Sequence, residues 1–126
     1  MKKWYLKFAS FEKPNDIFDL VKSGEKTIET RPVSPGSSKN PAIYQKGDIL
    51  VLKSVDTGEI IEKVIDFVHI YPSIEAMASS ESPSKILPGI TSKQGIIDVF
   101  DVAKRKWGSS YAKKLENYGI VAIGMK

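Results

Sequence analysis

The chain has 126 residues, of which 41% are hydrophobic and 27% are charged. A chain of this size can bury one hydrophobic core and is too short for two ordinary domains, so we expect a single domain over residues 1–126. Lysine and arginine number 19 against 15 acidic residues, a formal net charge of +4 that permits nucleic-acid binding without indicating it specifically.

The chemistry open to the chain is narrowed by its lack of cysteine and by its single histidine, His69. Disulfides, thiolate zinc sites, cysteine nucleophiles and multi-histidine metal sites are therefore excluded. No Walker loop or dinucleotide fingerprint occurs, and we expect no cofactor and no metal. No apolar run approaches the roughly 20 residues that span a bilayer, and no signal-peptide pattern follows the basic start. We therefore expect a cytoplasmic protein without membrane contact.

The first elements are predicted from composition and from capping residues. Trp4–Phe8 is rich in aromatic residues and predicts a first strand. Asn15–Ser23 has the apolar spacing of an amphipathic helix, and Gly24 lies where a left-handed residue would end it. Lys26–Arg31 then reads as a strand, which we expect to stop at Arg31 because Pro32 cannot donate to a strand ladder.

The middle of the chain predicts a loop and a long hairpin. Residues 32–41 are rich in proline, glycine and serine, a composition that suits either a substrate-contacting loop or a mobile one. Asp48–Lys53 and Glu59–Tyr71 read as strands joined by a turn at Asp56-Thr57-Gly58. The second strand exceeds the usual length of about 5 to 6 residues, so we expect a bulge or bend midway, as in a strand that wraps a small barrel.

The last third of the chain is mostly helical by pattern. A short helix is expected from Pro72 to Met77, followed by a polar loop over Ser79–Pro83. Two further helices are expected, one from about Ser92 and one over Ser109–Tyr118. An apolar strand over Tyr118–Met125 closes the chain.

The segment Gly24–Arg31 carries the most chemistry, with a lysine, a carboxylate and a guanidinium behind a glycine. Because side chains alternate on a strand, Glu29 and Arg31 should share one face with Thr27, while Lys26 lies on the other. A plain alternative is an exposed Glu29–Arg31 ion pair of little energetic weight, with Lys26 in solvent.

The residues from Asp16 to Arg31 resemble the signature of the ASCH family, which is related to PUA RNA-binding domains. The family pattern Gly-x-Lys-x-x-Glu-x-Arg is met at Gly24, Lys26, Glu29 and Arg31 without a gap. Further matches follow in the expected order, at Lys46–Ile49, Asp56–Glu59, Leu87–Gly89 and Tyr118–Ile123. The resemblance implies an α+β fold, a small PUA-like β-barrel of about five to six strands with flanking helices, and a cleft lined by the signature residues.

The role of Lys26 depends on the partner of Glu29. Burial near an arginine lowers the pKa of a lysine and makes it a usable base or nucleophile, whereas a nearby carboxylate restores its charge. If Glu29 interacts with Lys26, the lysine is a fixed cation. If Glu29 instead pairs with Arg31, Lys26 is freer to activate water or to attack a carbonyl.

The first hypothesis is binding of RNA or of a modified nucleoside in the cleft. Lys26 and Arg31 would contact phosphates or acceptor edges, Glu29 would accept from an exocyclic amine, and Trp4, Tyr5 or Tyr44 would stack on a base. The ligand-binding set is then Lys26, Thr27, Glu29, Arg31 and Tyr44.

Basic residues lie near both ends of the chain, at positions 2–7 and 104–114. They would form one phosphate-facing patch if the terminal strands lie side by side. The alternative is a pair of solvated helix faces.

The second hypothesis is a metal-independent hydrolase that acts on an N-acyl nucleoside or on RNA. One branch of the family hydrolyses the acetyl amide of N4-acetylcytidine with a lysine, a threonine and a glutamate, and others resemble single-stranded RNA nucleases. The lysine falls on Lys26, Glu29 stands where the threonine is expected, and the glutamate would be Glu81 or Glu75. The resemblance thus implies a catalytic set of Lys26, Glu29 and Glu81.

The third hypothesis is a non-catalytic protein-interaction domain in which the signature only joins a helix to the barrel.

Overall fold

The computed structural model describes all 126 residues of the chain. In chain order the elements are β1 (Lys3–Phe8), α1 (Asp16–Ser23), β2 (Ile28–Pro32), the 3-10 turn η1 (Pro41–Ile43), β3 (Ile49–Ser54), β4 (Ile60–Tyr71), α2 (Ile74–Ser80), α3 (Pro83–Ile86), α4 (Lys93–Trp107), α5 (Ser109–Tyr118) and β5 (Ile120–Met125). None of the helices has the length and apolar character that crossing a membrane requires.

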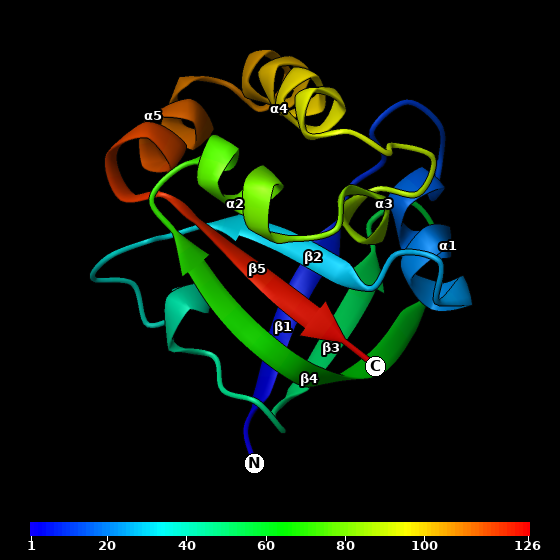
Figure 1. The fold of residues 1–126 in the computed structure, drawn as a ribbon. Coiled ribbons are helices and arrows are strands. Elements are labelled where there is room, and N and C mark those ends of the chain that lie inside the picture. The colour runs from blue at the N-terminus through cyan, green and yellow to red at the C-terminus, as the bar shows by residue number, and fades with distance from the viewer.

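The five strands form one curled sheet in the order β1-β3-β4-β5-β2, so β1 and β2 are its two edges. The β1–β3 pair is parallel and the others are antiparallel. The sheet curves into a half-barrel, with α2, α4 and α5 over one side and α1 beside it (Figure 1). The predicted α+β fold, a small PUA-like barrel of about five to six strands with flanking helices, is confirmed, with five strands that form a half-barrel.

The curl of the sheet comes from the long strand β4. Residues Ile60–Val64 pair with β3, while Ile65–Tyr71 pair with β5, and the register shifts between Ile65 and Phe67. The irregularity lets one strand belong to both halves of the sheet, because a bulge bends the strand and increases its local twist. The predicted bend midway along this strand is confirmed.

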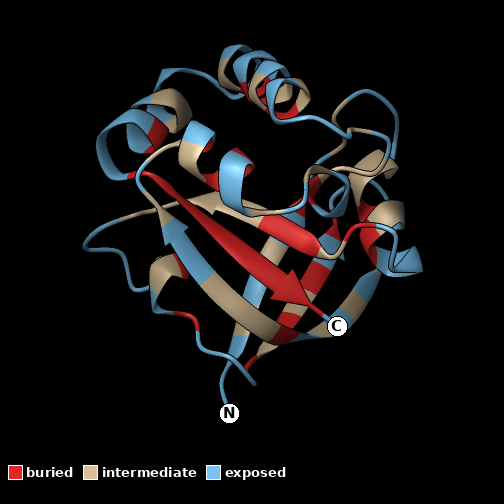
Figure 2. Cartoon of the chain, in the orientation of Figure 1, coloured by how far each residue is buried: buried red, intermediate tan, exposed pale blue.

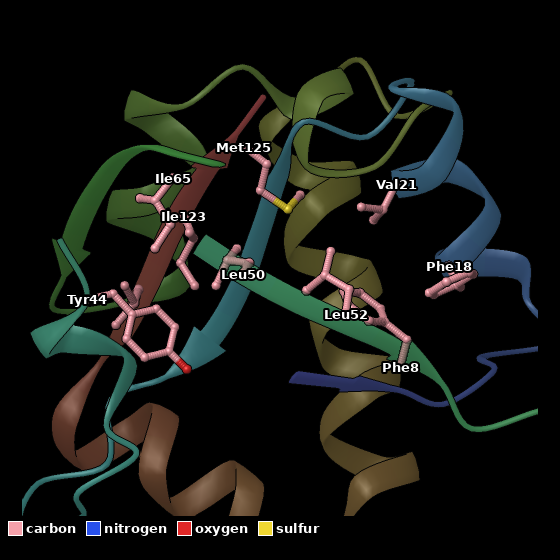
Figure 3. Packing of buried hydrophobic residues seen from close by; sticks show 10 residues of the cluster. Phe8, Phe18, Val21, Tyr44, Leu50, Leu52, Ile65, Ile123 and Met125 are labelled. Carbon is pink, nitrogen blue, oxygen red and sulfur yellow. The ribbon is translucent and has the colours of Figure 1, made fainter. Parts of the chain in front are cut away.

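The strand β5, between β4 and β2, separates two hydrophobic cores and is buried along its whole length (Figure 2). Val121, Ile123 and Met125 point into the half-barrel, whereas Ile120 and Ala122 pack under the helices. The barrel core also holds Phe8, Phe18, Val21, Tyr44, Leu50, Leu52 and Ile65 (Figure 3). Because successive side chains point to opposite faces, a strand buried on both faces must be apolar at every position.

Several predicted boundaries differ from the structure. The predicted polar loop Ser79–Pro83 is shorter in the structure, because α2 extends to Ser80 and the short helix α3 begins at Pro83, a residue suited to the first turn of a helix. Tyr118 ends α5 rather than starting the last strand, and β2 begins at Ile28 and includes Pro32, which lies at the end of an edge strand where a missing N–H costs little.

The condition for a single basic patch, that the two terminal strands lie side by side, is not met, because β3 and β4 lie between β1 and β5. The end of α4 nevertheless reaches the segment that follows β1. Lys106 donates to the carbonyl of Phe11 and lies 5.0 Å from the centre of its ring. The basic end of α4 therefore lies against the segment that follows β1.

Candidate functional site

The signature segment leaves α1 through Gly24, which has the positive φ of 84° that favours glycine. The N–H of Lys26 then donates to the Leu20 carbonyl at 2.9 Å, and the N–H of Thr27 donates to Lys85 at 3.1 Å. These bonds hold the chain against α1 and α3 before the strand begins. The alternation predicted from Lys26 onward is therefore wrong for that residue, whose side chain lies on the same side as Glu29.

Lys26 is a buried lysine, with 5% of its surface exposed. Its Nζ donates to the carbonyl of Ile28 at 2.7 Å and to the carbonyl of Ile86, at the end of α3. The same Nζ lies 3.8 Å from Oε1 of Glu29. Burial lowers the pKa of Lys26, the charge of Glu29 opposes this shift, and the charge of Arg31 adds to it.

Glu29 interacts with both cations of the signature. Its Oε1 accepts from the N–H of Thr30 at 2.7 Å, and its Oε2 lies 3.4 Å from Nη2 of Arg31. Glu29 and Arg31 thus lie next to each other on one face, as predicted. Glu29 interacts with Lys26 and with Arg31 at the same time. An ionised carboxylate offers about four acceptor positions, so Glu29 retains acceptor capacity.

Arg31 joins the two open edges of the half-barrel. Its Nη2 donates to the carbonyl of Lys7 on β1 at 3.0 Å, and the guanidinium carbon lies 5.3 Å from the centre of the Phe8 ring. Since β1 and β2 share no ladder, this side chain is a direct polar link across the gap. A guanidinium has five N–H donors in a planar fork, and this geometry leaves several of them free.

A cavity of about 360 Å³, the first cavity, opens at this gap between the sheet edges and the helices. Its polar groups come from the signature, namely Lys26, Glu29, Thr30 and Arg31, together with Lys7 and Tyr111. The rest of its lining is apolar and comprises Phe8, Ala9, Phe11, Ile17, Pro32, Ile86, Leu87, Ile96, Val99, Phe100, Ala103 and Trp107. A mostly apolar pocket with a few convergent polar groups is the usual form of a small-molecule site.

Tyr111, on α5, was not foreseen as a site residue. Burial and the charge of Glu29 raise the pKa of its phenol to about 12, while Arg31 opposes the shift. Its ring packs edge-on against Trp107, at 5.5 Å between centres. In the sequence Tyr111 shows only helical spacing to Leu115 and Tyr118, a pattern that indicates core packing and carries no sign of a cavity.

Tyr44 lies on a second cavity, of about 390 Å³, which it shares with Arg31 and Tyr111. Its ring stacks on Trp4, with centres 4.5 Å apart, and Trp4 Nε1 donates to Asp48 at 2.9 Å. Both aromatic faces that meet in this stack are therefore already occupied by each other. Tyr5, the other proposed stacking residue, is exposed on β1.

The remaining predicted residues lie outside the first cavity. Thr27 contributes backbone bonds, since its carbonyl accepts from Met125 at 2.8 Å. Glu81 follows α2, where its Oε2 lies 2.7 Å from Nδ1 of His69 and accepts from the hydroxyl of Tyr71. Glu75 is exposed on α2. No group of three or more histidine, aspartate or glutamate side chains could hold a metal ion.

No protein-family model and no curated protein matches the chain. Among solved structures, the hypothetical protein PH0355 has 23% identity and a TM-score of 0.70, with 98% of this chain and 97% of that one covered. Protein PF0455 from Pyrococcus furiosus has 23% identity and a TM-score of 0.61 over 98% and 96%. An ASCH domain from Lactobacillus crispatus has 18% identity and a TM-score of 0.61 over 99% and 79%. The chain therefore has the fold of an ASCH domain over nearly its whole length.

Proposed function

We propose that the chain is a member of the ASCH family that binds the base of a nucleoside, free or unpaired in single-stranded RNA, in the first cavity. The observation that carries the proposal is the buried carboxylate of Glu29, which faces a mostly apolar cavity between Lys26 and Arg31 with acceptor capacity unused. Carboxylates accept hydrogen bonds from the exocyclic amine of cytosine.

The walls of the first cavity suit a flat aromatic ligand. Phe100, Trp107 and Tyr111 come from α4 and α5, and Phe8 lies on the opposite side with the guanidinium of Arg31 above its ring. Aromatic side chains and arginine planes are the groups on which unpaired bases stack. A base that carries an amine would thus find an acceptor in Glu29 and donors in Arg31.

Titration calorimetry with cytidine and uridine tests this proposal. We expect cytidine to bind about 10- to 100-fold more tightly, because uridine presents a carbonyl oxygen to the carboxylate where cytidine presents an amine. Glu29→Gln should reduce cytidine affinity and narrow this difference, whereas Glu116→Gln, an exposed change on α5, should leave both unchanged. Equal affinity for the two nucleosides in the unmodified protein would contradict the role of Glu29.

The second candidate function is hydrolysis of an N-acyl nucleoside, and it is favoured by the lowered pKa of Lys26. A lysine whose ammonium is disfavoured can act as a base or a nucleophile near neutral pH. Against this, Nζ donates to two backbone carbonyls, which hold it in place and favour its charged form. Incubation with N4-acetylcytidine separates the two functions, because only the hydrolase releases cytidine with time; binding without release supports the first proposal.

A further inference from the structure

The first and second cavities are neighbours that share part of their walls. Arg31, Pro32, Trp107 and Tyr111 line both of them. The free N–H groups of Arg31 therefore lie at the junction, with Glu29 on one side and the second cavity on the other. A ligand that fills the first cavity and extends past Arg31 enters the second.

The charged groups of the second cavity are all positive. Arg31, Lys39 and Lys114 line it, and no aspartate or glutamate does. Lys39 and Lys114 take part in none of the ion pairs of the chain, which use Lys3, Lys22, Lys26, Arg31, His69 and Lys126. Arg31 is paired with Glu29 on the side of the first cavity, but Lys39 and Lys114 have no carboxylate partner, so the second cavity has an excess of positive charge that favours binding of an anion.

The hydroxyl of Tyr44 is a further unused donor in the second cavity. The residue is 5% exposed, and it lines the cavity without a hydrogen-bond partner for its hydroxyl. The oxygen points away from the neighbouring Leu50 and Ile123 (Figure 3). No buried side-chain polar atom of the protein lacks a partner, so this hydroxyl is accessible from the second cavity, where it can donate to a ligand oxygen.

The loop that follows β2 supplies part of the same wall. Ser34 and Lys39 come from the segment between β2 and η1, Pro41 is the first residue of η1, and Ser110 and Lys114 come from α5. The side chain of Asn40 ties this loop, because its Oδ1 accepts from the N–H of Ser34 at 3.0 Å and of Ala42 at 3.1 Å. The cations of the second cavity thus come from β2, from the loop that follows it and from α5.

We propose that the second cavity binds a phosphate group covalently attached to the nucleoside whose base occupies the first cavity, with Arg31, Lys39, Lys114 and the Tyr44 hydroxyl as its donors. The ligand is then a nucleotide and not a neutral nucleoside. This inference rests on the proposed function. The phosphate can be that of a mononucleotide or of an RNA strand, since both present negatively charged oxygens to the same donors.

Calorimetric titrations with cytidine, cytidine 5′-monophosphate and the dinucleotide CpC test the inference. We expect the monophosphate to bind about tenfold more tightly than cytidine at low salt and to lose this advantage as salt rises. Lys114→Ala and Lys39→Ala should each reduce monophosphate affinity about three- to tenfold while leaving cytidine affinity unchanged. CpC binding more tightly than the monophosphate assigns the phosphate to an RNA strand, and the reverse assigns it to a mononucleotide.

Matched controls come from neighbouring lysines. Lys113→Ala lies next to Lys114 on α5 but lines neither cavity, and Lys46→Ala is an exposed change that also lines neither. Both should leave every affinity unchanged. If cytidine binds and the monophosphate binds no more tightly, the inference is overturned while the proposed function stands. If no ligand of the series binds, both are overturned.

Discussion

Replacing Lys26 with methionine should strongly destabilise the protein. The change keeps a long apolar stem but removes the ammonium that donates to the carbonyls of Ile28 and Ile86. The first carbonyl belongs to β2 and the second to the end of α3, so one side chain holds the short helix against the edge of the sheet. Glu29 also loses a cation at 3.8 Å.

The size of the effect follows from these contacts. A hydrogen bond from a charged donor contributes about 1.5–3 kcal/mol, and removing one partner of a buried ion pair costs about 3–5 kcal/mol because the remaining charge is left uncompensated. Two terms act in the opposite direction: Arg31 still lies 3.4 Å from Glu29, and the variant avoids the desolvation that lowers the pKa of Lys26. We therefore expect a loss of about 3 kcal/mol, at the low end of the range for a broken buried pair.

Urea unfolding followed by tryptophan fluorescence measures this loss, since Trp4 and Trp107 lie in different parts of the fold. For a domain of this size, about 3 kcal/mol corresponds to a Tm lower by roughly 10–15 °C. The double variant Lys26→Met with Glu29→Gln should recover part of the loss, because it removes the carboxylate that the single change leaves unpaired.

A Lys26→Met variant within about 0.5 kcal/mol of the unmodified protein, the spread typical of surface changes, would refute this reasoning. The ammonium would then not hold α3 against β2. Lys22→Met is the matched control, because Lys22 forms only an exposed ion pair with Glu59, and such pairs contribute little. The control should change the free energy of unfolding by less than about 1 kcal/mol.

Three further predictions concern the sheet, the phenol of Tyr111 and Glu81. Gly124→Ala should destabilise the protein by about 1–3 kcal/mol in urea unfolding, because a Cβ at this position would lie 2.1 Å from the Phe67 ring; an unchanged midpoint would contradict this packing. Tyr111 should titrate near pH 12, and Glu29→Gln should lower that pKa, since the charge of Glu29 is one of its causes; NMR of isotope-labelled tyrosine measures both. Between pH 10 and about 12 the folded protein keeps the phenol proton that the unfolded chain loses at the usual pKa of 10.0. The contribution of Tyr111 to the free energy of unfolding is therefore complete below pH 10 and declines as pH rises toward about 12. Tyr111→Phe should make the free energy of unfolding less dependent on pH in this range. Glu81→Gln should leave cytidine affinity unchanged, as Glu81 contacts His69 and Tyr71 away from both cavities; a loss of affinity in calorimetry would contradict that separation.

Much of the scaffold could be predicted because its signals are local. The glycine that ends α1, the turn at Gly58 and the unusual length of β4 each reflect a few neighbouring residues, and the structure has the corresponding cap, turn and register shift. The signature also identified Lys26, Glu29 and Arg31 as one group through their spacing and the family resemblance. These three side chains do meet at one cavity.

The surroundings of that group could not be predicted, because they depend on contacts between distant segments. The second carbonyl that holds Lys26 comes from Ile86, at the end of a helix of only four residues that the sequence did not indicate. Tyr111 reaches the first cavity from α5, and its sequence spacing indicates only a helix face. Arg31 on β2 reaches Lys7 on β1 across a gap between the two edges of the sheet. This gap exists because β1 pairs with β3 and does not pair with β2.

The most direct test of the proposed base site is a crystal structure of the protein with cytidine. The account predicts the cytosine ring in the first cavity among Phe8, Phe100 and Trp107, with its exocyclic amine within hydrogen-bond distance of a Glu29 oxygen. A cytosine bound anywhere else, or bound in the cavity with its amine turned away from Glu29, would contradict the account.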